Sequence, residues 1–294
     1  MPLKEFHRAH PQPVGTIYHD ARHSKTVSGI AYQSALRRGL NSSQAKLISQ
    51  VALLHDWDPR REAGAQARVP STIAALRADF AGHKPMFARF RGTSVLRQRF
   101  GWGERELRIA EAMIQRTEFP FSDAHKNPFY KEQSPDSRYE SMLKAMGPAD
   151  RALVMREAAI LSEYVDKSSL YYTRPFETVA QTVTGLANEL RHDIGPKAPT
   201  HPQLLGGTGS FIETIGQAVN FAKDREIAQR LGVSLRIPNR AEFFATLPAQ
   251  YAKRFASTLT GFRVLGRNLK RGKSLGRSTK KATRAARRAM LRRR

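Results

Sequence analysis

Residues 41–57 decide the fold class, and they read N-S-S-Q-A-K-L-I-S-Q-V-A-L-L-H-D-W. Apolar side chains recur at Leu47, Ile48, Val51 and Leu54, which is the spacing of one face of an α-helix. Asn41 and the two serines after it can begin this helix, because side-chain oxygens at an N-cap accept bonds from the first free amides. The stretch therefore predicts an amphipathic helix whose last residues are a histidine and an aspartate.

The same period of 3.6 residues extends over most of the chain. It starts in the segment from Val27 to Ala35, and no segment alternates apolar and polar residues as a strand of a hairpin would. Further helices are expected at about 70–90, 104–116, 148–166, 176–191, 209–231 and 240–262. Loops are expected at 117–135 and 192–208. We therefore predict an all-α fold with several helices around one core.

Composition limits the class of protein. The chain has 294 residues, of which 40% are hydrophobic, and this is enough to build a core. The absence of cysteine excludes a disulfide scaffold and any Cys-ligated metal site. No run of 18 apolar residues predicts a membrane span, and residues 1–13 lack the apolar core of a signal peptide, so we expect a cytoplasmic protein. We expect an N-terminal extension at 1–13, one domain at 14–262 and a basic tail at 263–294.

Positive charge is concentrated in that tail. The chain has 50 Lys+Arg against 25 Asp+Glu, a net charge of +25, and 14 of the basic residues lie between Arg263 and Arg294. No acidic residue follows Glu242. We expect a disordered tail or a conditional helix, which either binds nucleic acid or an anionic membrane surface without specificity or only keeps the protein soluble. Because no aromatic residue follows Phe262, sequence-specific reading of RNA is not expected.

Histidines and aspartates form the candidate site. His19 and His23 are four residues apart, on one face of a helix; His55 and Asp56 end the apolar helix; and Asp166 is a carboxylate late in another apolar helix. Each feature alone is more often a cap, a surface contact or a paired core residue. Their combination indicates a metal centre, since imidazole and carboxylate together suit Zn, Mn, Fe or Mg.

Several segments resemble the signatures of the HD-domain metal-dependent phosphohydrolases, with the class I cyclic-nucleotide phosphodiesterases as the nearest branch. Residues 18–23, Y-H-D-A-R-H, are similar to the family's Y-H-N-x-x-H. Residues 52–56, A-L-L-H-D, resemble A-x-x-H-D. Residues 165–169, followed by T-R-P-F at 173–176, resemble A-D-x-S-N and R-P-W, and Phe211 begins a pair similar to the family's F-I.

The resemblance implies a helical HD-type bundle and a metal-dependent phosphoric ester hydrolase, a phosphodiesterase or a nucleotide phosphohydrolase. It implies that His23, His55, Asp56 and Asp166 bind one divalent metal ion, and that Asp56 bridges to a second. The ions would be Mn, Mg, Zn, Fe or Ni, and they would activate a water molecule. His19 would be the general acid that protonates the leaving oxygen.

The substrate stays open, because the chain departs from the family outside the ligand set. Arg97 stands where the family has a supporting acid, and Thr208 stands where it has a purine-reading glutamine three residues before Phe211. Arg60 and Arg61 could hold a phosphate, although solvated surface arginines are an equal alternative. The candidate substrate contacts are thus Arg60, Arg61, Thr208 and Phe211. The alternative function is a catalytically reduced HD-fold binding or sensor protein, tethered to nucleic acid or an anionic membrane surface by its basic tail.

Overall fold

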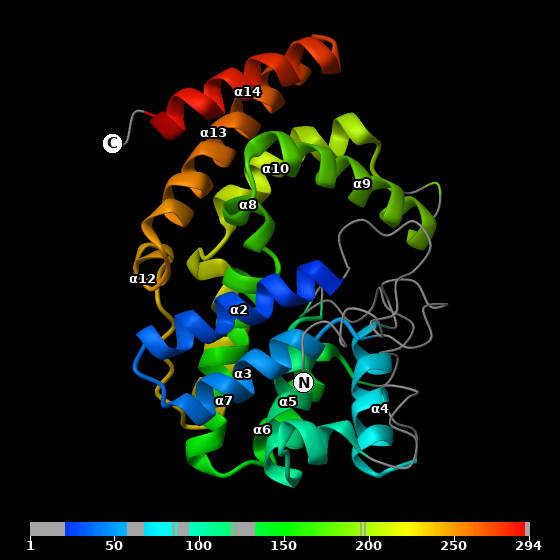
Figure 1. The fold of residues 1–294 in the computed structure, drawn as a ribbon, viewed down its shortest axis with the longest axis vertical. Coiled ribbons are helices and arrows are strands. Elements are labelled where there is room, and N and C mark those ends of the chain that lie inside the picture. The colour runs from blue at the N-terminus through cyan, green and yellow to red at the C-terminus, as the bar shows by residue number, and fades with distance from the viewer. Residues whose placement is uncertain are drawn as a thin grey trace. The chain divides into compact units, whose positions relative to one another are not determined.

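The structure, a computed structural model, describes residues 21–57, 68–83, 86, 94–118, 121, 133–194, 196 and 198–291. These residues form helices and no strand, so the all-α prediction is confirmed (Figure 1). The chain divides into two compact units. The first contains His19–Asp166 and Phe221–Pro238, and the second contains Lys167–Asn220 and Asn239–Arg294. The single domain predicted at 14–262 is thus shared between two units, which we describe separately.

The first unit is built around α5. Its elements are α2 (Ala21–Arg37), α3 (Ser42–Leu54), α4 (Arg68–Phe80), the π-helical η3 (Leu96–Phe100), α5 (Glu104–Arg116), α6 (Pro135–Lys144), α7 (Pro148–Ile160), the π-helical η6 (Leu161–Asp166) and α11 (Ala222–Arg230). Helix α5 contacts α3, α4, α6 and α7, and α2 packs along α3. The side chains at the centre, such as Val51, Ala110, Met113 and Val154, are fully buried.

Helix α3 has the start and the buried face that its sequence predicts. The Asn41 side chain accepts a hydrogen bond from the Gln44 amide at 2.9 Å, and the Gln44 side chain accepts one from the Asn41 amide at 3.2 Å. This capping box confirms the predicted start. The predicted apolar face is buried, and the helix ends at Leu54, so that His55 and Asp56 lie in the turn that follows.

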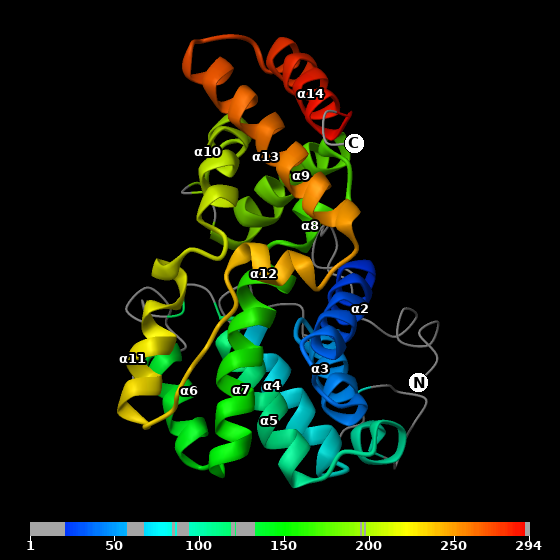
Figure 2. The ribbon, with the colours of Figure 1, turned by 90° about the vertical axis from the view of Figure 1, so that its left-hand side faces the viewer.

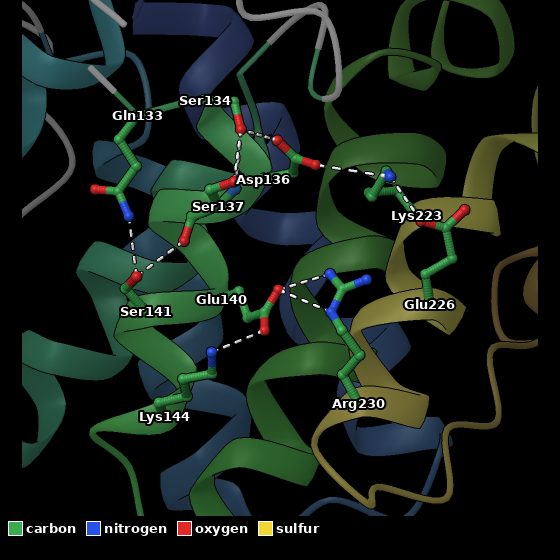
Figure 3. Close-up of polar contacts among 10 residues, drawn as sticks. All are labelled: Gln133, Ser134, Asp136, Ser137, Glu140, Ser141, Lys144, Lys223, Glu226 and Arg230. Atoms are coloured by element: carbon green, nitrogen blue, oxygen red, sulfur yellow. Dashed lines mark hydrogen bonds and ion pairs between the residues drawn. The ribbon is translucent and has the colours of Figure 1, made fainter.

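Polar contacts connect α11 to α6, although more than 70 residues separate the two helices in sequence (Figure 3). Arg230 donates from Nε and Nη2 to Glu140 Oε2, at 3.1 and 2.6 Å. Lys223 lies 3.8 Å from Asp136 and donates to Glu226 at 2.6 Å. Because these groups are exposed to solvent, each pair contributes little to stability.

A buried ion pair anchors α11 more firmly. Arg116, the last residue of α5, donates from Nε and Nη2 to the two carboxylate oxygens of Asp224 at 2.8 and 2.7 Å, and both side chains are almost fully buried. The guanidinium also lies over the Phe121 ring, 4.2 Å from its centroid. Burial would lower the pKa of Arg116, but the charge of Asp224 and the bonds to it raise the pKa above its ordinary value. Arg116 therefore keeps its charge inside the first unit.

The second unit is built around α13. Its helices are α8 (Ser169–Thr173), α9 (Phe176–Ile194), α10 (His201–Thr214), α12 (Arg240–Ala245), α13 (Ala249–Lys270) and α14 (Leu275–Leu291), and the 3-10 turn η8 (Ala218–Phe221) lies where the chain leaves it. Helix α13 contacts each of the other five helices. Glycines permit this: a Cβ at Gly266 would lie 2.9 Å from the Gly206 carbonyl oxygen, and one at Gly261 only 2.4 Å from the Phe176 ring.

Several predicted helix boundaries were wrong. The helix predicted at 70–90 ends at Phe80. The helix predicted at 240–262 is two helices, because Pro248 lacks an amide hydrogen and disfavours helical geometry in the residue before it. The helix predicted at 209–231 is divided between α10 and α11, which belong to different units. Helix α6 was not predicted, and the first half of α10 lies in a segment predicted as a loop.

The expectation of a disordered tail is also corrected. Helix α13 crosses residue 262 and ends at Lys270, and α14 returns alongside it, as Figure 2 shows. Ser278, Ala282 and Ala286 of α14 are buried, and the Ser257 hydroxyl of α13 donates to the Ala286 carbonyl at 2.7 Å. A thin stripe of small residues is enough here, because small side chains let two helices approach closely.

Candidate metal centre

Four side chains of the first unit converge on one point: His23, His55, Asp56 and Asp166. Each offers one ligand atom, and these atoms all lie within 4.8 Å of one another. In the part of the chain that the structure describes, no other group of three or more such side chains comes together in this way. The cluster could hold a metal ion, and its members are the four ligands predicted from the sequence.

The ends of helices bring these side chains together. His23 lies near the start of α2, on the buried face that also carries Val27 and Ile30. His55 and Asp56 follow α3 directly, in a turn. Adjacent residues within a helix point about 100° apart, so the helix end is what allows both side chains to face one point.

A π-helical segment carries the fourth side chain. Helix α7 ends at Ile160, and the chain continues with the wider π turn of η6 until Asp166. The intervening side chains are buried, and the Tyr164 hydroxyl donates to the Pro238 carbonyl at 2.8 Å. Such π segments inside helices are rare, and many of them lie at functional sites. Here the segment contacts α2 and sets the position of the Asp166 carboxylate.

Both imidazoles direct Nε2 at both carboxylates. His23 Nε2 lies 3.1 Å from Asp166 Oδ1 and 3.5 Å from Asp56 Oδ2. His55 Nε2 lies 3.1 Å from Asp56 Oδ2 and 3.2 Å from Asp166 Oδ1. The ring centroids are 5.4 Å apart at 60°, so the rings do not stack on each other. The four ligand atoms therefore face a common centre.

The tautomer of His55 is set by the backbone. Its Nδ1 lies 2.8 Å from the Ala52 carbonyl oxygen, and since a carbonyl only accepts, Nδ1 carries the hydrogen. This leaves Nε2 to bind either a proton or a metal ion. A backbone or carboxylate partner on the second nitrogen is the usual arrangement for a metal-binding histidine. Sequence patterns cannot show this contact, because the partner is a main-chain oxygen.

The electrostatics of the cluster favour a cation at its centre. Burial would lower the pKa of His55, but the charges of Asp56 and Asp166 and their hydrogen bonds raise it well above its ordinary value. Burial would raise the pKa of Asp166, but the charge of His55 and the bonds from both histidines lower it well below its ordinary value. Two carboxylates and two imidazole nitrogens this close need a positive charge between them, which protons or a divalent ion can supply.

The cluster is largely screened from solvent. The His55 and His23 side chains are 1% and 6% exposed, and those of Asp56 and Asp166 are 10% and 16% exposed. The carboxylates are thus the more accessible members. A site with buried imidazoles and more open carboxylates can hold an ion and still leave it in reach of water.

The other predicted site residues are not part of this cluster as described. His19, Arg60 and Arg61 lie outside the described residues, so their roles stay predictions. Thr208 and Phe211 are in α10, in the second unit. The Thr208 hydroxyl donates within its own helix, to the Leu204 carbonyl at 2.7 Å, and the Phe211 ring lies edge-on to Tyr171.

Arg97, which stands in place of a family acid, has a structural contact in η3. Its guanidinium lies over the Phe80 ring, 4.2 Å from the centroid. The buried Asp79 carboxylate organises the start of the same segment, because it accepts hydrogen bonds from the Ser94 hydroxyl and from the Val95 and Leu96 amides. This part of the chain is therefore held by its own contacts and needs no ligand to explain it.

No model of a protein family, no curated protein and no solved structure matches the chain. The class of site is consequently defined by its geometry: two imidazoles and two carboxylates, within ligand distance of one another, on an all-α scaffold. Among the described residues, no helix is both long and apolar enough to cross a bilayer.

Proposed function

We propose that the protein is a metal-dependent phosphohydrolase whose centre is formed by His23, His55, Asp56 and Asp166. The observation that carries the proposal is the convergence of these side chains, from three segments up to 143 residues apart, within 4.8 Å. The resemblance of these segments to the HD-type signatures supports a hydrolytic function. The class of substrate is a phosphate ester.

The donor set fits a divalent cation. Two imidazole nitrogens suit Zn, Fe or Ni, and two carboxylate oxygens suit Mn or the harder Mg. When bound, the cation neutralises phosphate charge and lowers the pKa of a water molecule. His55 is held by the Ala52 carbonyl, and Asp56 and Asp166 supply the negative charge that balances the ion.

Residues of the chain would carry out the remaining tasks, which are to exclude water from the ligands, to protonate the leaving oxygen and to hold the substrate. Burial of the two imidazoles keeps bulk water from competing for their nitrogens. His19 would give the leaving oxygen its proton, a role that suits imidazole because its ordinary pKa lies near neutrality. Arg60, Arg61, Thr208 and Phe211 are the candidate substrate contacts from the sequence.

Metal analysis combined with turnover tests this proposal. The purified protein is assayed on bis-p-nitrophenyl phosphate with Mn, Mg, Zn, Ni or Fe, next to His55→Ala and Asp56→Asn. The control is His83→Ala, which removes an exposed histidine outside the cluster. We expect both cluster variants to lose metal and turnover, and His83→Ala to keep both.

Three results would count against the proposal. A wild-type protein that binds none of these ions excludes the metal centre altogether. Metal binding without turnover of any phosphate ester supports the alternative, a catalytically reduced sensor or binding protein that keeps the ligands. Turnover that survives Asp56→Asn would show that the hydrolytic centre lies elsewhere.

A further inference from the structure

Helix α14 presents a continuous row of cations. Its exposed basic residues are Arg277, Lys280, Lys281, Arg284, Arg287 and Arg288. At 100° per residue these six fall within an arc of about 120°, and at 1.5 Å per residue they extend over about 16 Å. The charges that the sequence places in a tail are thus gathered on one face of an ordered helix.

The opposite face of α14 is already occupied. Ser278, Ala282 and Ala286 are buried, α14 packs along α13, and Ser257 donates to the Ala286 carbonyl. An amphipathic helix that binds a bilayer inserts its apolar face among the lipids. Helix α14 could do so only by leaving α13, and Leu291, which is 62% exposed, is its one large apolar side chain in solvent. The packing therefore disfavours a lipid surface as the partner.

Among the described residues, most of these cations have no carboxylate partner. Arg287 donates from Nε to Glu177 Oε1 of α9 at 2.8 Å. No carboxylate among the described residues pairs with Arg277, Lys280, Lys281, Arg284 or Arg288, and no acidic residue follows Glu242 in the sequence. Five neighbouring positive charges repel one another in the folded protein, and a polyanion would relieve this repulsion.

Hydroxyl groups lie beside the cations. An open concavity of about 450 Å³ along α14 is lined by Gly276, Thr279, Lys280, Thr283, Arg284 and Arg287. Threonine hydroxyls next to lysine and arginine are the side chains that contact phosphate and sugar oxygens in protein–nucleic acid complexes. No aromatic residue is present on this helix to stack on unpaired bases.

We propose that the basic face of α14 binds the phosphate backbone of double-stranded nucleic acid without sequence specificity. A duplex offers closely spaced phosphates along a rigid path, which matches a straight row of cations, whereas a single strand would be held mainly by stacking. DNA suits an α-helix better than RNA, because the major groove of B-form DNA admits one and that of A-form RNA does not. This surface is independent of the metal centre.

The test uses the full-length protein and three probes: a 30-base-pair DNA duplex, an RNA duplex of the same length, and vesicles of phosphatidylcholine with 30% phosphatidylserine. Binding is measured from about 50 to 200 mM salt. The variant Arg277→Gln/Lys281→Gln/Arg284→Gln removes three charges from the face. Its matched control, Lys25→Gln/Lys46→Gln/Arg108→Gln, removes three exposed charges of the first unit.

We expect the wild type and the control to bind DNA with affinities within about twofold of each other, and the α14 variant to bind at least about tenfold more weakly. Its slope of log K against log salt should be shallower by about 2 to 3, since each lost phosphate contact removes about 0.9. A second variant, Arg277→Lys/Lys281→Arg/Arg284→Lys, keeps the charges and should keep the affinity.

Circular dichroism establishes that each variant is folded. Equal loss of affinity in the α14 variant and the first-unit control would overturn the proposal, because net charge and not this face would then be responsible. Binding to vesicles with no binding to either duplex would overturn it in favour of a membrane surface, and absence of binding to all three probes would also overturn it. The ratio between the affinities for the DNA and RNA duplexes shows which of the two the basic face prefers, and we expect it to favour DNA.

Discussion

The first unit and helix α14 handle charge in opposite ways. The first unit buries two sets of charged groups, the four-residue cluster and the Arg116–Asp224 pair, and each set has partners from distant segments. Helix α14 exposes its charges on one face, and five of its cations have no carboxylate partner among the described residues. The difference shows that the net charge of +25 describes neither region. Location and pairing determine what a charged group can do.

The largest effect should come from breaking the buried pair. Arg116→Met leaves the Asp224 carboxylate in the interior without its cation, so we expect the free energy of unfolding to fall by about 3–5 kcal/mol. Urea denaturation measures it. The comparison variant Arg230→Ala breaks the exposed pair with Glu140 and should lower the free energy of unfolding far less, because solvent screens that pair. Equal losses in the two variants would contradict the distinction between buried and exposed charge.

The next effect concerns the cluster. Asp166→Asn keeps the shape of the side chain but removes a charge that two imidazoles face, and we expect metal affinity to fall by more than about 100-fold. Titration calorimetry measures the affinity. Asp150→Asn, which alters an exposed pair with Arg105, is the control and should bind metal as the wild type does. Unchanged affinity in Asp166→Asn would remove this residue from the ligand set.

Metal removal should lower the free energy of unfolding by the amount that metal binding adds to it. An ion that binds the folded cluster and not the unfolded chain should, at 100 times its Kd, add about 2.7 kcal/mol to the free energy of unfolding. Thermal unfolding with metal and with a chelator measures the difference. The same comparison in Asp166→Asn should show little shift. A chelator that lowers the Tm of both proteins equally would indicate that metal acts at another site.

A smaller effect is expected where α14 packs on α13. Ala282→Leu inserts a large side chain into a contact made by small ones, and overpacking of this kind costs about 1–3 kcal/mol. Amide hydrogen exchange measures this local loss of stability, and we expect faster exchange confined to α14. Ala285→Leu, at a half-buried position on the same helix, is the comparison and should exchange more slowly than Ala282→Leu. Identical exchange in both would mean that the stripe does not hold the helix.

The smallest effect on stability should come from the exposed row itself. Arg277→Gln/Lys281→Gln/Arg284→Gln should change the free energy of unfolding by less than about 0.5 kcal/mol, because these side chains pair with no carboxylate in the part of the chain that the structure describes. Urea denaturation measures it next to the wild type. A marked loss of stability would show that these basic side chains contribute to packing. It would contradict the distinction between the exposed charges of α14 and the buried, paired charges of the first unit.

Much of the site could be predicted because its members are ordered by simple local patterns. The capping segment at Asn41 and the apolar face up to Leu54 specify α3, and the helix end then places His55 and Asp56 together. Asp166 was predictable as a lone carboxylate on an apolar helix. The π segment that carries it, and the Ala52 carbonyl that orients His55, left no pattern in the sequence, because both are features of the backbone.

The structure of the basic tail, in contrast, could not be predicted from local sequence patterns. Its composition, rich in Lys and Arg and poor in large apolar residues, is typical of disorder, and only the surface of α13 provides a place for Ser278, Ala282 and Ala286 to be buried. Helix breaks such as the one at Pro248 were similarly missed, since apolar periodicity continued across them.

The sequence by itself determined the all-α class and the number and sign of the charges, because periodicity and residue chemistry are local properties. The set of four candidate ligands was predicted from the resemblance of short segments to the HD-type signatures. Only the tertiary structure decided that these ligands meet within 4.8 Å, and that α14 keeps its small residues inside and its cations in solvent. Both outcomes depend on contacts between segments far apart in the chain, and the free energy of such contacts is set by packing and desolvation in the folded protein.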